Sequence, residues 1–176
     1  MILGLDPAKR NLGWALLDDV TGLPIAAGTG DLDVKDGGWM QTQVSRVFDE
    51  ISVRARVLRR DVVALAMEDP FAASMSNAKA YGAVMALCQA EFHGRFGDMP
   101  FRVYLPKVWR VAAGLPGNAS KLAVMDAAYN LAADPWSVER LVALLDDQDA
   151  ADALMIARAY WLETNGEATW EPFPEL

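Results

Sequence analysis

The segment that constrains the fold most is the apolar run Asp61-Val-Val-Ala-Leu-Ala-Met-Glu68. Its length and β-branched residues predict a strand buried on both faces, as in a parallel sheet flanked by helices. Asp69 and Pro70 follow, and the proline is expected to end the strand. A carboxylate, Glu68, is therefore expected at the end of a central strand.

Residues 1–6 are expected to form a second buried strand, which also ends in a carboxylate, Asp6. Two more strands, at 11–17 and at about 25–32, are joined through a hairpin connection at 18–24. Gly28 and Gly30 suggest a bulge or a close backbone approach in the third of these strands. The three strands together predict an antiparallel meander.

Apolar residues at helical spacing predict helices over about 39–60 and 74–92, and a fifth strand is expected at 101–105. Further helices are expected at 107–113, from an N-cap at Ser120 to about 133, after Asp134-Pro135, and from 147 or 148 to about 163. His93 is expected to cap a helix end, and Cys88 to be buried. This order predicts one α/β domain over residues 1–176, with helices on both faces of a five-stranded mixed sheet.

The chain carries a formal net charge of −8, which at first disfavours nucleic-acid binding. The excess lies in residues 131–176, which hold ten acidic and two basic residues, and DNA binding depends on local basic patches. The helix dipole explains a cluster of arginines near residue 60, namely Arg54, Arg56, Arg59 and Arg60. One cysteine, no signal peptide and no membrane-length apolar run lead us to expect a cytoplasmic protein.

Asp149 and Asp152 stand three residues apart in the run Gln148-Asp-Ala-Ala-Asp-Ala-Leu154. Alanine favours helix, and residues spaced by three share one helix face, so the two carboxylates would lie side by side. One interpretation is a solvated acidic helix start, which the helix dipole favours. The other is half of a divalent-metal site.

Ligands of α/β sheets gather where the strands end. If the strands ending at Asp6 and Glu68 are adjacent and parallel, the two carboxylates lie side by side, and the last helix could add Asp149 and Asp152. Four such charges need cations, and hard oxygen ligands select Mg²⁺ or Mn²⁺. A two-metal carboxylate site is typical of phosphodiester hydrolysis.

The chain resembles RuvC-type Holliday junction resolvases, which have the RNase H-like fold, over most of its length. The resemblance rests on Ile2-Leu-Gly-Leu-Asp-Pro7 with Asn11-Leu-Gly-Trp14, on Ala66-Met-Glu68, and on Asp149-Ala-Ala-Asp-Ala-Leu154. It implies that Asp6, Glu68, Asp149 and Asp152 are catalytic ligands of two Mg²⁺ ions, which Mn²⁺ can replace. It also implies a homodimer that makes paired symmetric nicks in a four-way junction. No motif of the sequence identifies a further partner, such as a branch-migration motor.

The resemblance implies further DNA contacts. Phe71 would be the aromatic residue that intrudes at the junction crossover, where stacking on a base contributes roughly 1–3 kcal/mol. Lys107 and Lys121 would face the scissile phosphate, and Lys121 would also be catalytic. Weaker candidates for backbone contacts are Arg10, Lys79 and Arg110. Each of these residues could instead be a loop anchor or a solvated surface charge.

The helices that follow Glu68 are the expected dimer surface, where Tyr81, Val84 and Met85 could serve or could equally be core. Two positions depart from the family: Ala8 replaces the usual glycine, and Asp69 adds a fifth carboxylate. These departures and the acidic total would fit a divergent or phage-borne member.

Three other functions compete with junction resolution. The chain could be a nuclease of this fold acting on other branched DNA or on an RNA–DNA hybrid. It could be a non-cleaving junction-binding relative, although such a relative would be expected to lack a ligand and none is missing. A sugar-kinase or actin-like ATPase is disfavoured, because it needs a second glycine-rich phosphate loop and a longer chain.

Overall fold

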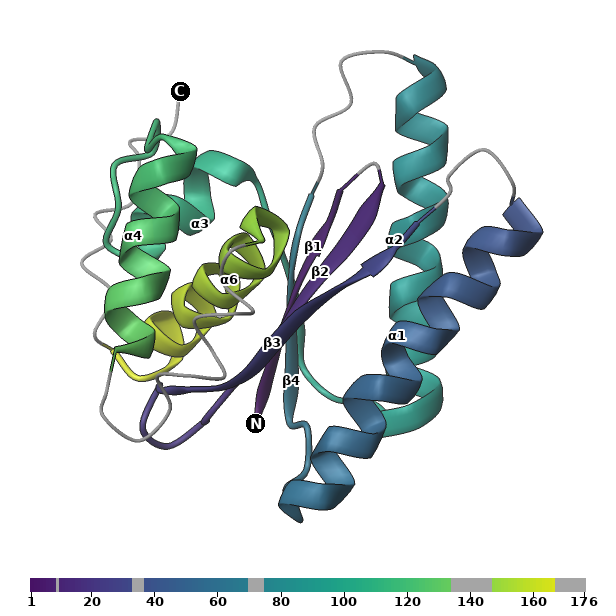
Figure 1. Cartoon of the computed structure of the whole chain (residues 1–176), viewed down its shortest axis with the longest axis horizontal. Helices are drawn as coiled ribbons and strands as arrows, with labels where there is room; N and C mark the ends of the chain where they lie inside the picture. Colours follow the sequence, from purple (N-terminus) through teal and green to yellow (C-terminus); the bar gives the residue numbers. More distant parts are fainter. Residues whose placement is uncertain (9, 33–36, 70–74, 134–146, 167–176) are drawn as a thin grey trace.

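A five-stranded mixed sheet separates two layers of helices (Figure 1). The computed structural model describes residues 1–8, 10–32, 37–69, 75–133 and 147–166, without the side chains of 37–39 and 75–80. The strand order is β3-β2-β1-β4-β5, with bounds β1 Ile2–Pro7, β2 Asn11–Leu17, β3 Pro24–Asp31, β4 Ala64–Glu68 and β5 Phe101–Tyr104. β1, β2 and β3 form the expected antiparallel meander, while β4 runs parallel to both β1 and β5. The predicted mixed sheet is therefore confirmed.

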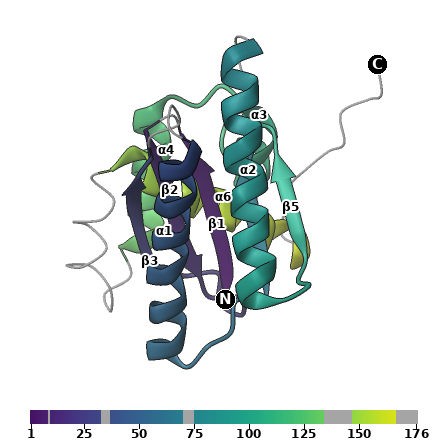
Figure 2. The ribbon, with the colours of Figure 1, turned by 90° about the vertical axis from the view of Figure 1, so that its right-hand side faces the viewer.

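The helices divide between the two faces of the sheet. α1 (Gly37–Leu58) and α2 (Met75–Phe96) lie side by side over one face, as Figure 2 shows. α3 (Pro106–Ala112), α4 (Lys121–Ala132) and α6 (Gln148–Thr164) cover the other face (Figure 1). Each layer encloses its own apolar core against the sheet. Among the described helices, none is long and apolar enough to cross a membrane.

Side chains of the central strands alternate between the two cores. Leu5 of β1 and Met67 of β4 belong to the core under α1 and α2, whereas Ala66 belongs to the core under α6. Successive side chains of a strand point to opposite faces. Asp6 and Glu68 follow Leu5 and Met67, so both carboxylates lie on the α6 face.

α6 packs directly onto β1 and β2 because two glycines leave room for its backbone. A Cβ atom on Gly4 would lie 2.0 Å from the carbonyl oxygen of Ala153, and one on Gly13 would lie 2.0 Å from that of Asp149. The helix contributes small buried side chains, namely Ala150, Ala151, Ala153 and Ala157. Glycine in the sheet and alanine in the helix therefore set the depth at which α6 lies.

Several boundaries differ from the sequence predictions. β4 begins at Ala64 rather than at residue 61, and α2 continues to Phe96. His93 consequently lies inside the last turn of α2, with its Nδ1 atom 3.2 Å from the carbonyl oxygen of Gly97. Cys88 is buried, as expected. The helix expected after Asp134-Pro135 lies outside the described residues.

The glycines of β3 show a close approach rather than a bulge. A Cβ atom on Gly28 would lie 2.9 Å from the Trp14 ring, and one on Gly30 would lie 2.2 Å from Cγ2 of Val47. The register of β2 and β3 shifts elsewhere, between Leu16 and Leu17.

Gly4→Ala should destabilise the protein, because its methyl group would collide with the backbone of α6. Overpacking of this kind costs about 1–3 kcal/mol or more, and chemical denaturation would measure the loss. Gly94→Ala is the matched control: nothing lies within 4 Å of a Cβ atom there, and alanine favours helix. An unchanged free energy of unfolding in Gly4→Ala would contradict the close packing of α6.

Candidate active site

Two carboxylates lie at neighbouring strand ends. β1 and β4 are parallel neighbours with Leu5 opposite Met67, so Asp6 and Glu68 each stand one residue beyond that pair. The prediction that Asp6 and Glu68 lie side by side required these two strands to be adjacent and parallel, as they are. Asp6 is only 7% exposed, which is unusual for a carboxylate without a paired cation.

The start of α6 brings Asp149 and Asp152 to the same end of the sheet. Asp147 is the N-cap, and its side chain accepts a hydrogen bond from the Asp149 backbone N–H at 2.9 Å. The hydroxyl of Thr29 on β3 donates to the other oxygen of Asp147 at 3.0 Å. Since Gly13 also contacts the backbone of Asp149, the first turn of α6 is fixed against both β2 and β3.

Neutral donors hold three of the four carboxylates. The Asn11 amide donates to Asp149 at 2.9 Å, and the Gln148 amide donates to Asp152 at 3.2 Å. The buried indole of Trp109 on α3 donates to Glu68 in a short hydrogen bond. None of the three donors was predicted as a site residue. Asn11 and Gln148 stand in the sequence motifs quoted above, which could have identified them. No sequence motif points to Trp109.

The pKa values show how closely the carboxylates interact. Burial, and then the charges of Glu68, Asp152 and Asp149, raise the pKa of Asp6 well above its ordinary value. Burial likewise raises the pKa of Glu68 to about 7, with a contribution from Asp152 and despite the hydrogen bond from Trp109. The pKa of Asp152 is raised by burial and by Asp149. Negative charge is therefore poorly compensated at this end of the sheet.

Arg110 is the cation placed among these groups. Its charge acts to lower the pKa values of Asp6, Glu68 and Asp152. Its Nε atom is buried without a hydrogen-bond partner, and its guanidinium lies 5.1 Å from the centre of the Trp109 ring. The family resemblance predicted Arg110 as a weaker candidate for contact with the DNA backbone. The structure instead places it, half-buried, beside the carboxylates.

The four acidic residues have the chemistry for a hard divalent cation but not yet its coordination geometry. Oxygen donors from several elements suit Mg²⁺ or Mn²⁺, and one oxygen of Asp152 is buried without a partner. Within the described part of the chain, no three acidic, histidine or cysteine side chains converge closely enough to hold an ion. Side-chain rotation would have to bring the oxygens together.

The other predicted residues have varied positions. Lys121 is exposed at the start of α4, after the N-cap Ser120, and its charge acts on the pKa of Asp152. Lys107 and Arg10 are exposed, and the stem of Lys107 lies over Gly117. Lys79 lies in α2. The Lys79 side chain and the whole of Phe71 fall outside the described residues.

Two further expectations concern Asp69 and the dimer surface. The charge of Asp69 contributes to the raised pKa of Glu68, so it acts on the site electrostatically. Val84 is completely buried in the core under α1 and α2 and is unavailable to a partner. Tyr81 and Met85 are partly exposed.

The stability of the metal-free protein should fall as pH rises from about 4.5 to about 7. The folded chain keeps the Glu68 proton up to a pKa of about 7, whereas the unfolded chain releases it near 4.5. Over this range Glu68 alone would lower the free energy of unfolding by up to about 3 kcal/mol, and the raised pKa values of Asp6 and Asp152 would lower it further. Melting in EDTA across this range would measure the slope.

Glu68→Gln should reduce that slope, because the glutamine cannot ionise, and the contributions of Asp6 and Asp152 should remain. Asp98→Asn, an exposed turn position, should leave it unchanged. A stability that is constant or rises over this pH range would contradict the crowding of charge at the site.

Comparison with known proteins identifies the fold. No protein-family model matches the sequence, and no curated protein matches it. The structure is similar to that of Thermus thermophilus RuvC, with 17% identity, a TM-score of 0.65, and coverage of 95% of this chain and 97% of that one. It is also similar to T. thermophilus RuvC in complex with a Holliday junction substrate, with 16% identity, a TM-score of 0.67, and coverage of 95% and 96%. The chain therefore has the RNase H-like fold of RuvC, as the sequence motifs predicted.

Proposed function

We propose that the chain is a divalent-metal-dependent endodeoxyribonuclease that resolves four-way DNA junctions by paired symmetric nicks. The observation that carries the proposal is the gathering of Asp6, Glu68, Asp149 and Asp152 at one sheet end of a RuvC fold. A RuvC of this fold has been solved with a Holliday junction substrate, which supports branched DNA as the ligand class.

In this proposal the four carboxylates hold two Mg²⁺ ions, or Mn²⁺ in their place. When bound, such ions supply a hydroxide nucleophile and stabilise the leaving 3′ oxygen. Asn11, Gln148 and Trp109 would then orient the ligands through the hydrogen bonds that they already donate. Their donation to one oxygen of each carboxylate leaves the other oxygen available.

The exposed cations near the site would bind DNA phosphates. Lys121 is exposed and acts on the pKa of Asp152, which supports a contact between its ammonium group and a phosphate at the site. Lys107 and Arg10 would contact the backbone farther along. Arg110, being half-buried, would compensate the carboxylates. The proposed roles of Phe71 and Lys79 rest on the sequence resemblance alone.

A homodimer is part of the proposal, because a two-fold junction requires two symmetric sites. Residues 1–176 would form one nuclease domain, with α2 at the dimer surface. Tyr81 and Met85 are the partly exposed residues that could contribute, whereas the buried Val84 would support α2 from the core.

Asp6→Asn should abolish cleavage of a synthetic four-way junction while preserving junction binding. The amide keeps the size of the side chain but loses the anionic ligand, so the rate should drop by at least about 1,000-fold. Gel assays with Mg²⁺ would measure nicking, and a band shift without metal would measure binding. Asp98→Asn, which is exposed and outside the site, is the control and should cleave normally.

The substrate panel distinguishes the competing functions. Symmetric nicking of the junction alone would support resolution. Preference for a flap or an RNA–DNA hybrid would favour a nuclease of this fold with another substrate. Binding without cleavage in either Mg²⁺ or Mn²⁺ would indicate a junction-binding protein, and equal cutting of linear duplex would contradict structure selectivity.

A further inference from the structure

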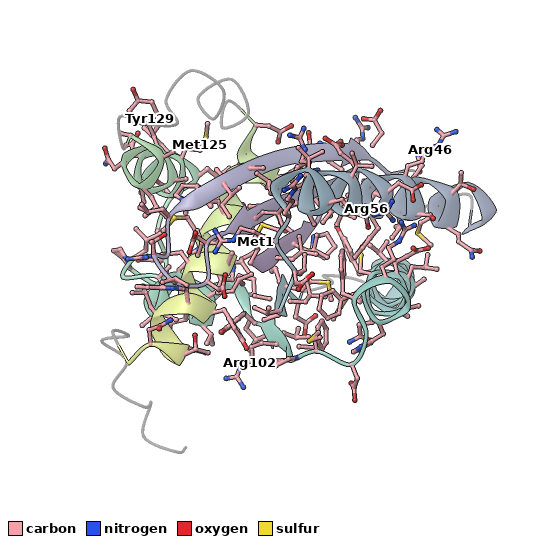
Figure 3. All side chains as sticks on the ribbon, turned by 90° about the horizontal axis from the view of Figure 1, so that it is seen from below. Met1, Arg46, Arg56, Arg102, Met125 and Tyr129 are labelled. Atoms are coloured by element: carbon pink, nitrogen blue, oxygen red, sulfur yellow. The ribbon has the colours of Figure 1, made fainter. Side chains whose placement is uncertain are left out.

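A second feature of the molecule lies at the end of the sheet away from the carboxylates. A pocket of about 760 Å³ opens between the C-terminal turns of α1 and α2, next to residues 60–63 that lead into β4. Four arginines line it beside apolar side chains that include Val63, Phe96 and Met99. Figure 3 views this end of the molecule, with Met1 near the middle and Arg56 beside α1.

Two of the four arginines are available to a ligand. Arg60 pairs with Asp18 and Asp19, and Arg95 pairs with Glu91 and Asp49. Arg56 and Arg59 are exposed, and within the described part of the chain neither forms an ion pair. The pocket therefore offers two arginines outside the ion pairs above, beside an apolar wall, and Asp61 is the one acidic residue among the described residues that line it.

Arg59 has a left-handed backbone, with φ of 52°, immediately after α1. Hydrogen bonds from Arg59 N to Arg56 O and from Arg60 N to Ala55 O make this a Schellman helix end, where glycine is favoured. The helix dipole explains why a cation is tolerated near this end. The helix dipole does not explain why an arginine occupies the strained left-handed position itself. A ligand-binding role for the Arg59 guanidinium would explain it.

The end of α6 lies close to this pocket. The Trp161 indole donates to the carbonyl oxygen of Asp19 at 3.1 Å, and the Asp19 carboxylate accepts from Arg60 at 3.3 Å. Arg60 in turn lines the pocket. α6 ends one turn beyond Trp161, and the described chain ends at Gly166. Ten residues extend at most roughly 33 Å, so the segment after Gly166 can reach the pocket.

Residues 167–176 have a composition that complements the pocket. They read Glu-Ala-Thr-Trp-Glu-Pro-Phe-Pro-Glu-Leu, with three glutamates, two aromatic residues and no lysine or arginine. We propose that this segment docks into the arginine-lined pocket of its own chain. Its glutamates would pair with Arg56 and Arg59, and its aromatic rings would cover Val63 and Met99, which are 38% and 37% exposed.

Photo-crosslinking of the full-length protein tests this docking. With p-benzoyl-phenylalanine in place of Phe173, dilute protein should form an intramolecular crosslink to Met99 or to residues 56–63, identified by mass spectrometry. Arg56→Glu combined with Arg59→Glu should lower the yield roughly tenfold, since the two reversals replace attraction to the glutamates of the segment with repulsion. Arg102→Glu, an exposed charge reversal on β5 outside the pocket, is the matched control and should leave the yield unchanged.

A charge swap makes the test sharper. Glu171→Lys with Glu175→Lys should lower the yield in the wild-type background and restore it in the Arg56→Glu, Arg59→Glu background. Crosslinks to other parts of the chain, crosslinks between molecules, or a yield that none of these changes affects would overturn the proposal. Melting temperatures would establish that every variant is folded.

Discussion

The close contact of α6 with β1 and β2 is the interaction on which the candidate site depends. Gly4 and Gly13 remove the side chains that would hold the helix away, and buried alanines on α6 occupy the space that remains. A larger residue on either side would lift the helix and move Asp149 and Asp152 away from Asp6. Figure 1 shows α6 lying against the sheet, and this contact fixes the core on that face. It thereby also limits how far apart the carboxylates can lie.

This packing places acidic groups where water cannot easily stabilise them. Burial raises the pKa values of Asp6, Glu68 and Asp152, and Arg110 compensates only part of their charge. Such an arrangement reduces the stability of the protein unless cations bind. In the proposed function the binding of metal ions would therefore add to folding stability as well as to catalysis.

Much of this arrangement could be predicted from the sequence. The apolar run ending at Glu68 and the short strand ending at Asp6 predicted buried strands of a mixed sheet, because continuous apolar runs are typical of strands that helices cover on both faces. Trp109 and Arg110 could not be placed, since their proximity to Glu68 depends on how α3 returns over the sheet after β5. Contacts of this kind arise from tertiary packing and leave no periodic signal in the sequence.

The sequence did not reveal the pocket at the far end, and three of its four arginines, Arg56, Arg59 and Arg60, were attributed to the helix dipole. The proposed function, however, depends on whether the carboxylates at the other end of the sheet bind metal ions. Anomalous diffraction from crystals soaked in Mn²⁺ would test it most directly. We predict strong peaks within coordination distance, about 2.2 Å, of oxygens from Asp6, Glu68, Asp149 and Asp152. The absence of any peak there, or peaks only at other surface carboxylates, would contradict the proposed metal binding.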